Sequence, residues 1–435
     1  MLKIYHDRPI AEKLEQGFLN GFQIGYTGPR REYRCDNLKS VTDNLEIARK
    51  KVGNEIEAGR VAGPFNQPPL PNLRCSPLGL VEKAQKGKYR LIHHLSFPAG
   101  DSVNDYISDQ DAKVRYIKFD EAVDYVAKMG VGAEIAKADL KDAFRMLPIH
   151  EDDFDLLGFT LEGQFYYDMA LPMGLKNACR IFTEFSTFLN WLLNQLLGRQ
   201  LCVHYLDDWL FFGLGGQAQC NKALNKFFAL CKLLGIPVAE DKTVLPCTCL
   251  TFLGLEIDTL SQQVRLPEDK LGSCKAKLQE MQGKRTATLR ELQSLLGYLN
   301  FICRGVRGGC PFLQRLVHLT RGVTHKAQGI HMNDEALADI EMWLQFLESF
   351  NGVTYFLPSV WQSSSVIHFY TDSAKSTGFA GYFKGSYIQG TWASIAVSPR
   401  NSIAYLEYVP VLQSLLVWGK QLANSKIVFH SDNQA

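Results

Sequence analysis

The sequence predicts an α+β protein of several domains, and three observations lead to this prediction. The chain has 435 residues, of which 46% are hydrophobic, so it can form two to four domains with buried cores. Strand patterns with period two and long amphipathic helical patterns occur along the same chain. The composition also shifts twice, to a basic stretch at residues 264–326 and to a new alternating strand after a Ser-rich segment that ends at residue 365.

The charge and the composition indicate which binding partners and which cellular compartment the sequence favours. The net charge is only +2, but residues 264–326 hold 12 Lys and Arg against 4 Asp and Glu, a local net of +8. A basic helical stretch favours a polyanionic partner, although a solvated charged surface is the alternative. The N-terminus has no signal-peptide pattern, and no apolar run reaches the roughly 18 residues of a membrane span. Eleven scattered cysteines are typical of free thiols, so we expect an intracellular protein, cytoplasmic or nuclear and not secreted, without a membrane partner.

The first part of the chain carries a basic hairpin. Residues 1–75 contain two helical patterns and a Pro- and Gly-rich connector, and we interpret them as scaffold. Residues 78–95 follow with a strand, a turn and a strand, which bear Lys83 and Arg90. Such a hairpin can clamp phosphates or a nucleic-acid strand. It can equally be a solvated hairpin, and the residues alone do not decide.

A second group of elements brings a carboxylate to the end of a strand. An amphipathic helix is predicted at residues 119–129, and alternation then predicts a strand that ends near Asp139, with Asp142 where the chain turns. A carboxylate at a strand end is a common metal ligand, but it can also simply cap a turn. A hairpin at residues 158–167 and a rigid turn at residues 171–177 precede a strongly apolar helix at residues 178–197.

Two adjacent carboxylates interrupt the apolar run at residues 203–212. Burial of unpaired carboxylates is costly, so Asp207 and Asp208 need compensation, and a hard divalent cation would supply it. Neighbouring side chains of a plain strand point to opposite faces, so both carboxylates reach one site only if they lie at the tip of a hairpin. A chance motif in a surface turn is the alternative.

The later elements are a helix at residues 220–234, the Lys242 turn, one strand at residues 250–257 and a helix that opens with the capping box Thr288-x-x-Glu291. Another helix is predicted at residues 334–350, before the polar segment. The final region places Asp372 and Asp432 at two strand ends and Glu407 on a helix, which repeats the carboxylate pattern of the first half.

The order of these stretches resembles a reverse transcriptase, over about residues 75–320. The matching motifs are Ala138-Asp139 with Asp142-Ala143-Phe144, Leu171-Pro-Met-Gly174, Tyr205-Leu-Asp-Asp208, Lys242 and Phe252-Leu-Gly-Leu255. Five motifs in the order of the family are far more specific than any one of them. The resemblance implies a right-hand polymerase with fingers, a ferredoxin-like palm and a thumb.

The last region resembles ribonuclease H through Thr371-Asp372-Ser373, Leu406-Glu407 and Ser431-Asp432-Asn433. Several sequence segments also resemble those of the tyrosine-recombinase (DIRS-like) retrotransposons. These segments are Ser76-Pro-Leu-Gly-Leu, Arg90-Leu-Ile-His-His-Leu-Ser96, Ser102-Val-Asn-Asp105, Thr288-Leu-Arg-Glu-Leu-Gln-Ser-Leu-Leu-Gly297 and Ser431-Asp-Asn-Gln-Ala435. The family carries a further acidic residue and further elements after this point, so we expect a C-terminally incomplete ribonuclease H-like domain.

The resemblance implies a role for each matching residue. It implies two Mg²⁺ ions, with Mn²⁺ as a substitute, on Asp139, Asp207 and Asp208, and a catalytic role for Lys242. It also implies nucleotide contacts, a primer grip and a doubtful second metal site. The nucleotide contacts would be Lys83, Arg90, Asp142, Ala143, the sugar-sensing Phe144, Met173 and Gly174. The primer grip would be formed by Phe252, Leu253 and Gly254. The ligands of the second metal site would be Asp372, Glu407 and Asp432.

The expected activity is RNA-directed DNA synthesis from deoxynucleoside triphosphates on an RNA template with a DNA primer. The product would be an RNA–DNA hybrid. An inactive remnant that only binds nucleic acid, and a nuclease, are the competing hypotheses. The expected domains are 1–75 (extension and connector), 76–260 (fingers and palm), 261–325 (thumb), 326–365 (linker) and 366–435 (ribonuclease H-like).

Overall fold

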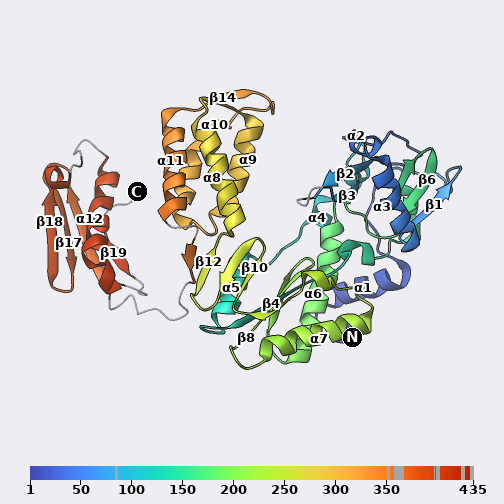
Figure 1. Cartoon of the computed structure of the whole chain (residues 1–435), viewed down its shortest axis with the longest axis horizontal. Helices are drawn as coiled ribbons and strands as arrows, with labels where there is room; N and C mark the ends of the chain where they lie inside the picture. Colours follow the sequence, from blue (N-terminus) through green and yellow to red (C-terminus); the bar gives the residue numbers. More distant parts are fainter. Residues whose placement is uncertain are drawn as a thin grey trace. The chain divides into compact units, whose positions relative to one another are not determined.

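The structure is a computed structural model, and it describes residues 1–83, 87–349, 353–356, 367–395, 397, 402–422 and 427–431. The chain divides into two compact units, Met1–Phe356 and Leu357–Ala435. Figure 1 shows their helices and strands. Within the part of the chain that the structure describes, no helix is both long enough and apolar enough to span a bilayer.

A four-stranded antiparallel sheet lies at the centre of the first unit, with the strand order β7-β8-β4-β9. Its strands are β4 (Glu134–Asp139), β7 (Cys202–Tyr205), β8 (Asp208–Gly213) and β9 (Val244–Cys247). Trp209 and Phe211 of β8 pack into one core with α6 (Ala178–Leu197) and α7 (Gln219–Leu234). Leu210 and Phe212 pack into a second core with α5 (Phe119–Ala127). Because both faces are covered, β8 is apolar at nearly every position.

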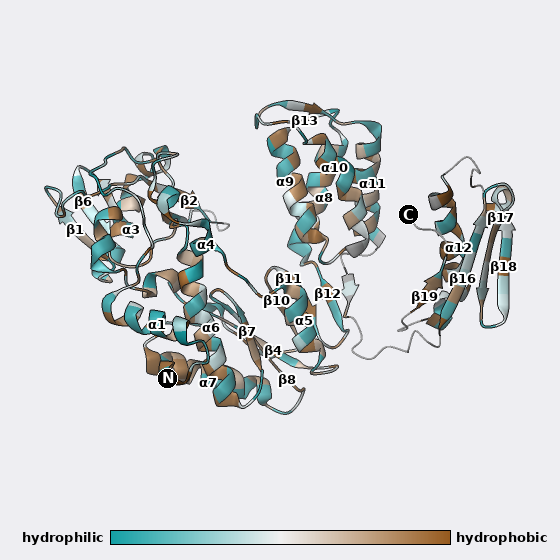
Figure 2. Cartoon of the chain, turned by 180° about the vertical axis from the view of Figure 1, so that it is seen from behind, coloured by the Kyte–Doolittle hydropathy of each residue, from teal (hydrophilic) through white to brown (hydrophobic). Residues whose placement is uncertain are grey.

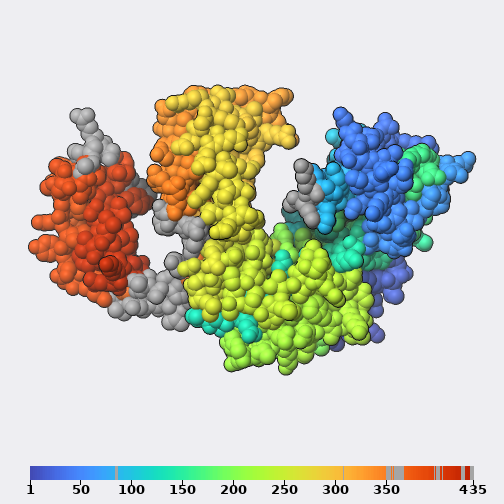
Figure 3. Space-filling model, in the orientation of Figure 1, coloured from blue at the N-terminus to red at the C-terminus, as the bar shows by residue number. Residues whose placement is uncertain are grey.

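The N-terminal residues are integrated into the first unit and do not form a separate extension. The helix α1 (Arg8–Asn20) places Ala11 and Leu14 in the core that also contains α6. The blue and green surfaces of Figure 3 accordingly run into each other. The predicted connector includes β1 (Val61–Phe65), which pairs with β6 (Gln164–Asp168) in the sheet β1-β6-β5.

A third core joins this sheet to the basic hairpin. Val41, Ala48 and Val52 pack there with residues of β1, β2 and β5. The elements of this region are α2 (Lys39–Thr42), α3 (Leu45–Glu57), β2 (Leu78–Glu82), β3 (Tyr89–His93) and β5 (Gly158–Leu161). Short helices also occur in the first unit, before, between and after these elements. They are η1 (Leu2–Ile4), η2 (Val103–Tyr106), α4 (Asp109–Ala112), η3 (Ala143–Met146), η4 (Glu151–Leu156) and η5 (Glu240–Lys242).

The predicted single strand at residues 250–257 is wrong, because the chain turns back in its middle. The strands β10 (Cys249–Phe252) and β11 (Leu255–Asp258) form a tight hairpin. Leu253 has φ 46° and Gly254 has φ 81°, which is the left-handed backbone that a two-residue hairpin turn requires. Together with β12 (Gln263–Arg265) and β15 (Val353–Tyr355) they make a four-stranded sheet.

Helices lie between β12 and β15 in the chain, and they carry both hydrophobic and hydrophilic residues along their lengths (Figure 2). They are α8 (Glu268–Gln282), α9 (Leu289–Ile302), η6 (Arg307–Leu313), α10 (Gln314–Leu319) and α11 (Asp334–Ser349), with the strands β13 (Thr286–Thr288) and β14 (Gly329–His331) between them. The Thr288–Glu291 capping box opens α9 as predicted. The described residues between 326 and 356 are not a linker, since Trp343 of α11 lies fully buried in the core that contains Leu299 of α9.

The second unit contains one sheet of order β18-β17-β16-β19. β16 and β19 run parallel, and the other pairs are antiparallel. Leu406 of α12 and Phe379 of β17 lie in a common core. The elements are β16 (His368–Ala374), β17 (Gly378–Phe383), β18 (Ser386–Thr391), η7 (Trp392–Ile395), α12 (Ile403–Trp418), η8 (Gly419–Leu422) and β19 (Val428–His430).

Candidate active site

The three carboxylates of the first half come together at the end of the central sheet. Asp139, the last residue of β4, is paired directly with Asp208, the first residue of β8. Residues that oppose each other in this way project from the same face of a sheet. Asp207 lies in the turn between β7 and β8, where Leu206 has φ 54°, and the Leu140 amide donates to the Asp207 carbonyl at 3.1 Å. The predicted hairpin with both carboxylates at its tip is therefore confirmed.

Two lysines pair with these carboxylates. Lys242 Nζ lies 2.9 Å from Asp139 Oδ2, and Lys137 Nζ lies 3.1 Å from Asp208 Oδ1. The hydrogen bond to Asp139 raises the pKa of Lys242, so this ammonium stays charged at neutral pH. Lys137 was not predicted. Its position two residues before Asp139 on the same strand places it on the same face, and this spacing could have identified it.

Among the three carboxylates, Asp207 has a raised pKa, so its ionisation is disfavoured in the folded protein. Its pKa is raised, first by burial and then by repulsion from Asp139 and Asp208. Among the described residues, no group of three or more His, Cys, Asp and Glu side chains is arranged to hold a metal ion. In this structure Asp139 and Asp208 each face an ammonium instead. The donor set nevertheless fits a hard divalent cation, because three crowded carboxylates need more positive charge than two lysines supply.

Cationic side chains surround Lys83, which follows β2. Its pKa is lowered, first by burial and then by Arg90, Lys51 and Lys242. Such a concentration of positive charge suits a polyphosphate ligand. Sequence reasoning missed Lys51, since this residue lies in α3, within the segment interpreted as scaffold, and only tertiary packing brings it near.

The turn after β4 carries the predicted nucleotide contacts Asp142, Ala143 and Phe144. Asp142 adopts a left-handed backbone with φ 56°, and Ala143 is buried. The half-buried Phe144 ring packs against Phe182 of α6, with 5.1 Å between ring centroids. The turn is thus held between the central sheet and the apolar helix.

Met173 and Gly174 lie in the turn before α6, and this turn is attached to β3. The His93 amide donates to the Met173 carbonyl at 3.3 Å, and Asn104 Nδ2 donates to the Gly174 carbonyl at 2.8 Å. Gly174 has φ 119°, and a Cβ there would lie 2.1 Å from the His93 carbonyl oxygen. Only glycine fits this close approach.

The predicted primer-grip residues form the turn of the β10–β11 hairpin. The Phe252 side chain is fully buried in the core, and Leu253 is half-buried. Because Phe252 points into the core, Leu253 and Gly254 are the more accessible of the three predicted residues.

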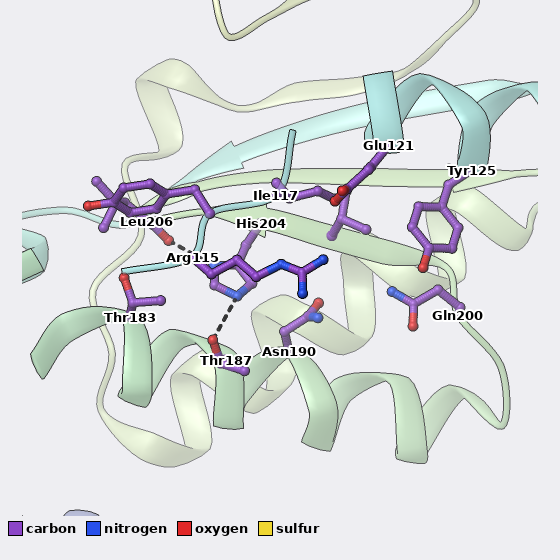
Figure 4. A pocket seen from close by; sticks show the side chains of 12 residues that line it. Arg115, Ile117, Glu121, Tyr125, Thr183, Thr187, Asn190, Gln200, His204 and Leu206 are labelled. Carbon is purple, nitrogen blue, oxygen red and sulfur yellow. Dashed lines mark hydrogen bonds between the residues drawn. The ribbon is translucent and has the colours of Figure 1, made fainter. Parts of the chain in front are cut away.

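A small pocket of about 200 Å³ lies beside the hairpin of β7 and β8. Figure 4 shows Thr187 and Asn190 of α6 pointing toward His204 of β7. Thr187 Oγ1 lies 3.5 Å from His204 Nε2, and the His204 ring stacks on Trp209 with 5.1 Å between centroids. Burial lowers the pKa of His204 to about 4, so this ring supports the hairpin as a neutral group.

The structure describes two of the three carboxylates predicted in the second unit. Asp372 of β16 is exposed, and Glu407 of α12 is buried, with Ser431 Oγ donating to Glu407 Oε2 at 3.4 Å. Asp432 lies outside the described residues. The complete set therefore stays a prediction.

Fold and site together define a polymerase domain, and the comparison with known families agrees. Residues 81–257 match the family model described as reverse transcriptase (RNA-dependent DNA polymerase). Residues 81–257 of the chain are therefore similar to a reverse transcriptase domain.

The relatives of this chain are viral proteins, and they include Gag-Pro-Pol polyproteins. The chain is 23% identical over 402 residues to the Gag-Pro-Pol polyprotein of Mason-Pfizer monkey virus, a match that covers 88% of this chain and 20% of the polyprotein. It is 26% identical over 290 residues to the Gag-Pro-Pol polyprotein of Human T-cell leukemia virus 3, which covers 63% of this chain and 17% of the polyprotein. The chain thus spans about a fifth of the length of these relatives.

The similar solved structures show the fold. The foamy viral protease-reverse transcriptase in complex with dsDNA has a TM-score of 0.57 and 18% identity, and the match covers 99% of this chain and 95% of that one. A second structure of that enzyme, the dRH form with ds DNA, has a TM-score of 0.58 and 18% identity, covering 94% of this chain and 66% of that one. The predicted α+β polymerase fold with a ribonuclease H-like region is confirmed.

Proposed function

We propose that this chain copies RNA into DNA as the reverse transcriptase of a retrotransposon. The observation that carries the proposal is the pairing of Asp139 with Asp208, with Asp207 in the adjoining turn, inside the matched residues 81–257. This places three carboxylates at one point of a domain whose class polymerises DNA. Nucleotidyl transfer depends mainly on positioning and on electrostatic stabilisation, which is what such a cluster provides.

Asp139, Asp207 and Asp208 would hold two Mg²⁺ ions, which Mn²⁺ could replace. When bound, the ions lower the pKa of the primer 3′-hydroxyl and neutralise charge on the triphosphate. Lys242 would hold a proton beside this site, because the hydrogen bond to Asp139 raises its pKa, and its position 2.9 Å from Asp139 Oδ2 supports a role as the acid toward pyrophosphate.

The nucleotide would lie between the basic hairpin and the turn after β4. Lys83 and Arg90 would bind its triphosphate, and the lowered pKa of Lys83 supports this role, because a bound polyanion relieves the repulsion among the cations. Asp142, Ala143 and Phe144 would contact the sugar. The Phe144 ring would occupy the space that a ribose 2′-hydroxyl needs.

The template and primer would contact other parts of the first unit. Met173 and Gly174 would pack on the incoming nucleotide or the template. The turn after Phe252, with Leu253 and Gly254, would position the primer end. The basic residues of 261–325, our proposed thumb, would hold the duplex backbone. The substrates would be an RNA template, a DNA primer and their hybrid; a similar foamy viral enzyme has been solved with an RNA/DNA hybrid.

The source element would be a tyrosine-recombinase (DIRS-like) retrotransposon, because five sequence segments of the chain resemble those of such elements. We also propose an intracellular location, cytoplasmic or nuclear, which the free thiols of all eleven cysteines support. The second unit would be ribonuclease H-like, with Mg²⁺ on Asp372, Glu407 and Asp432. Cleavage of the RNA strand of a hybrid, absent in Asp372→Asn, would test this unit separately.

Primer extension on an RNA template with Mg²⁺ tests the polymerase proposal. The wild type is expected to extend the primer, and Asp207→Asn and Asp208→Asn are expected not to. Asp241→Asn is the matched control, because this exposed carboxylate lies one residue before Lys242 and its loss should change nothing. Equal extension by all four proteins would contradict the proposal. Salt-sensitive binding of a hybrid without any extension would support the inactive remnant instead.

A further inference from the structure

Ion pairs surround the turn that carries Phe144, and they converge on a single carboxylate. Arg60 Nη1 donates to Asp142 Oδ2 at 3.0 Å, and Arg60 Nη2 donates to Glu55 Oε1 at 2.9 Å. Arg145 Nε donates to the other oxygen, Glu55 Oε2, also at 2.9 Å. Asp142 precedes Phe144 in the chain and Arg145 follows it. Both sides of the turn are therefore tied, through two arginines, to Glu55.

The Arg145 guanidinium is nearly buried and has several partners. Its side chain is 10% exposed, and its other two nitrogens meet the Ala170 carbonyl at 2.8 Å and Asp168 Oδ1 at 2.7 Å. Asp168 in turn lies 2.8 Å from His93 Nδ1. Charged hydrogen bonds in such a site are stronger and more directional than those in water. The network joins the turn to β3, β6 and the end of α3.

The backbone of the turn needs this support. Asp142 has φ 56°, a left-handed conformation that costs free energy for a residue other than glycine and persists only when its surroundings hold it. Within the turn, the Arg145 amide donates to the Asp142 carbonyl at 2.7 Å and the Leu147 amide to the Phe144 carbonyl at 3.1 Å. The side-chain tie of Asp142 to Arg60 lies outside the turn itself.

We propose that Glu55 is a positioning residue that fixes the Phe144 ring through Arg60 and Arg145 and thereby sets the discrimination between deoxyribonucleotides and ribonucleotides. The inference rests on the proposed function and deepens it. Glu55 lies in α3, outside the residues 81–257 that match the reverse transcriptase family. The N-terminal segment thus takes part in nucleotide choice without touching the nucleotide.

Glu55→Gln tests the proposal, since it keeps the size of the side chain and removes its charge. Glu57→Gln is the matched control, because Glu57 is an exposed carboxylate two residues further along the same helix. The measurement is the ratio of kcat/KM for a deoxynucleotide to that for the matching ribonucleotide. We expect Glu55→Gln to lower this ratio about tenfold, because misplacement of a positioning group by about 1 Å can cost about a hundredfold. Glu57→Gln should leave it within about twofold.

Two further variants separate this inference from the proposed sugar-sensing role of Phe144. Phe144→Val should itself lower the ratio, and Glu55→Gln should then add little to it, because both changes act on one ring. If Phe144→Val leaves the ratio unchanged, the proposed sugar-sensing role of Phe144 fails, and with it the effect of Glu55 on sugar choice. A Glu55→Gln protein that folds and keeps the wild-type ratio overturns the inference while the polymerase proposal stands.

Amide hydrogen exchange gives a readout that needs no activity. A peptide spanning residues 142–147 should exchange faster in Glu55→Gln than in the wild type or in Glu57→Gln, because the turn loses its anchor. Unchanged exchange overturns the positioning role even if the chain shows no primer extension. Faster exchange in a chain without extension would support the anchor and refute the polymerase proposal.

Discussion

Asp207→Asn is expected to abolish primer extension and, at the same time, to stabilise the folded protein. Burial and the neighbouring carboxylates raise the pKa of Asp207, so the folded state favours the protonated form more than the unfolded state does. For an acid with a raised pKa, ionisation costs stability above that pKa, and the cost disappears as the pH falls toward the ordinary carboxyl value. The neutral amide avoids this cost at every pH.

The size of the gain follows from the geometry. The repulsion that Asp207→Asn removes is the one between Asp207 and the two carboxylates beside it, Asp139 and Asp208. Two unit charges at about 5 Å and an effective dielectric constant of about 20 repel by about 3 kcal/mol. Lys242 and Lys137 offset most of this repulsion. We therefore expect a net gain of about 1 kcal/mol, which corresponds to about 2 °C in Tm for a chain of this size.

Thermal unfolding of the wild type, Asp207→Asn and the control Asp241→Asn at several pH values would measure this gain. The advantage of Asp207→Asn should be largest near neutral pH and should shrink as the pH falls. Extension by the same variant should fall below detection, by at least about a thousandfold, the scale of losing a main electrostatic contributor. A lower Tm than that of the wild type near neutral pH, or a gain that does not depend on pH, would refute the reasoning.

Three further predictions concern single contacts. Thr288→Ala removes the hydroxyl that caps α9 and should cost about 1 kcal/mol, read from the shift of the urea midpoint; an unchanged midpoint would contradict it. Gly174→Ala drives a Cβ against the His93 carbonyl and should lower stability by about 2 kcal/mol in thermal melts, whereas a wild-type melt would show that the turn can relax. Lys137→Met frees Asp208 from its ammonium, so half-maximal extension should need several-fold less Mg²⁺; a higher requirement would argue against this competition.

The local elements of the site could be predicted from the sequence because each has a strong local signal. The apolar helix at residues 178–197 has the predicted bounds in the structure, and the hairpin around Asp207 follows from two carboxylates inside an apolar run. Thr288 and Glu291 identify their own helix start, since both partners of a capping box lie within one turn.

The parts that could not be predicted depend on contacts between distant residues. The residues 250–257 have the composition of one strand, and nothing local marks Leu253 as a residue with positive φ. Glu55 and Lys51 lie in a helix of mixed polarity, and only the packing of α3 on the third core brings them toward the turn and the basic hairpin. The predicted linker includes the helix of Trp343, whose burial depends on residues distant in sequence such as Leu299.

The two-residue connection between β7 and β8 has a consequence for how this sequence can vary. Asp208 meets Asp139 only because alternation along β8 starts at that position. One inserted or deleted residue between Tyr205 and Asp208 would move the Asp208 carboxylate to the opposite face of the sheet. The same shift would turn Leu210 and Phe212 toward the core that now holds Trp209 and Phe211, and the reverse. Insertion or deletion of one residue in this connection would therefore remove the proposed active site and disturb two cores at once, whereas a replacement of a single packing residue near the hairpin would affect only its own core.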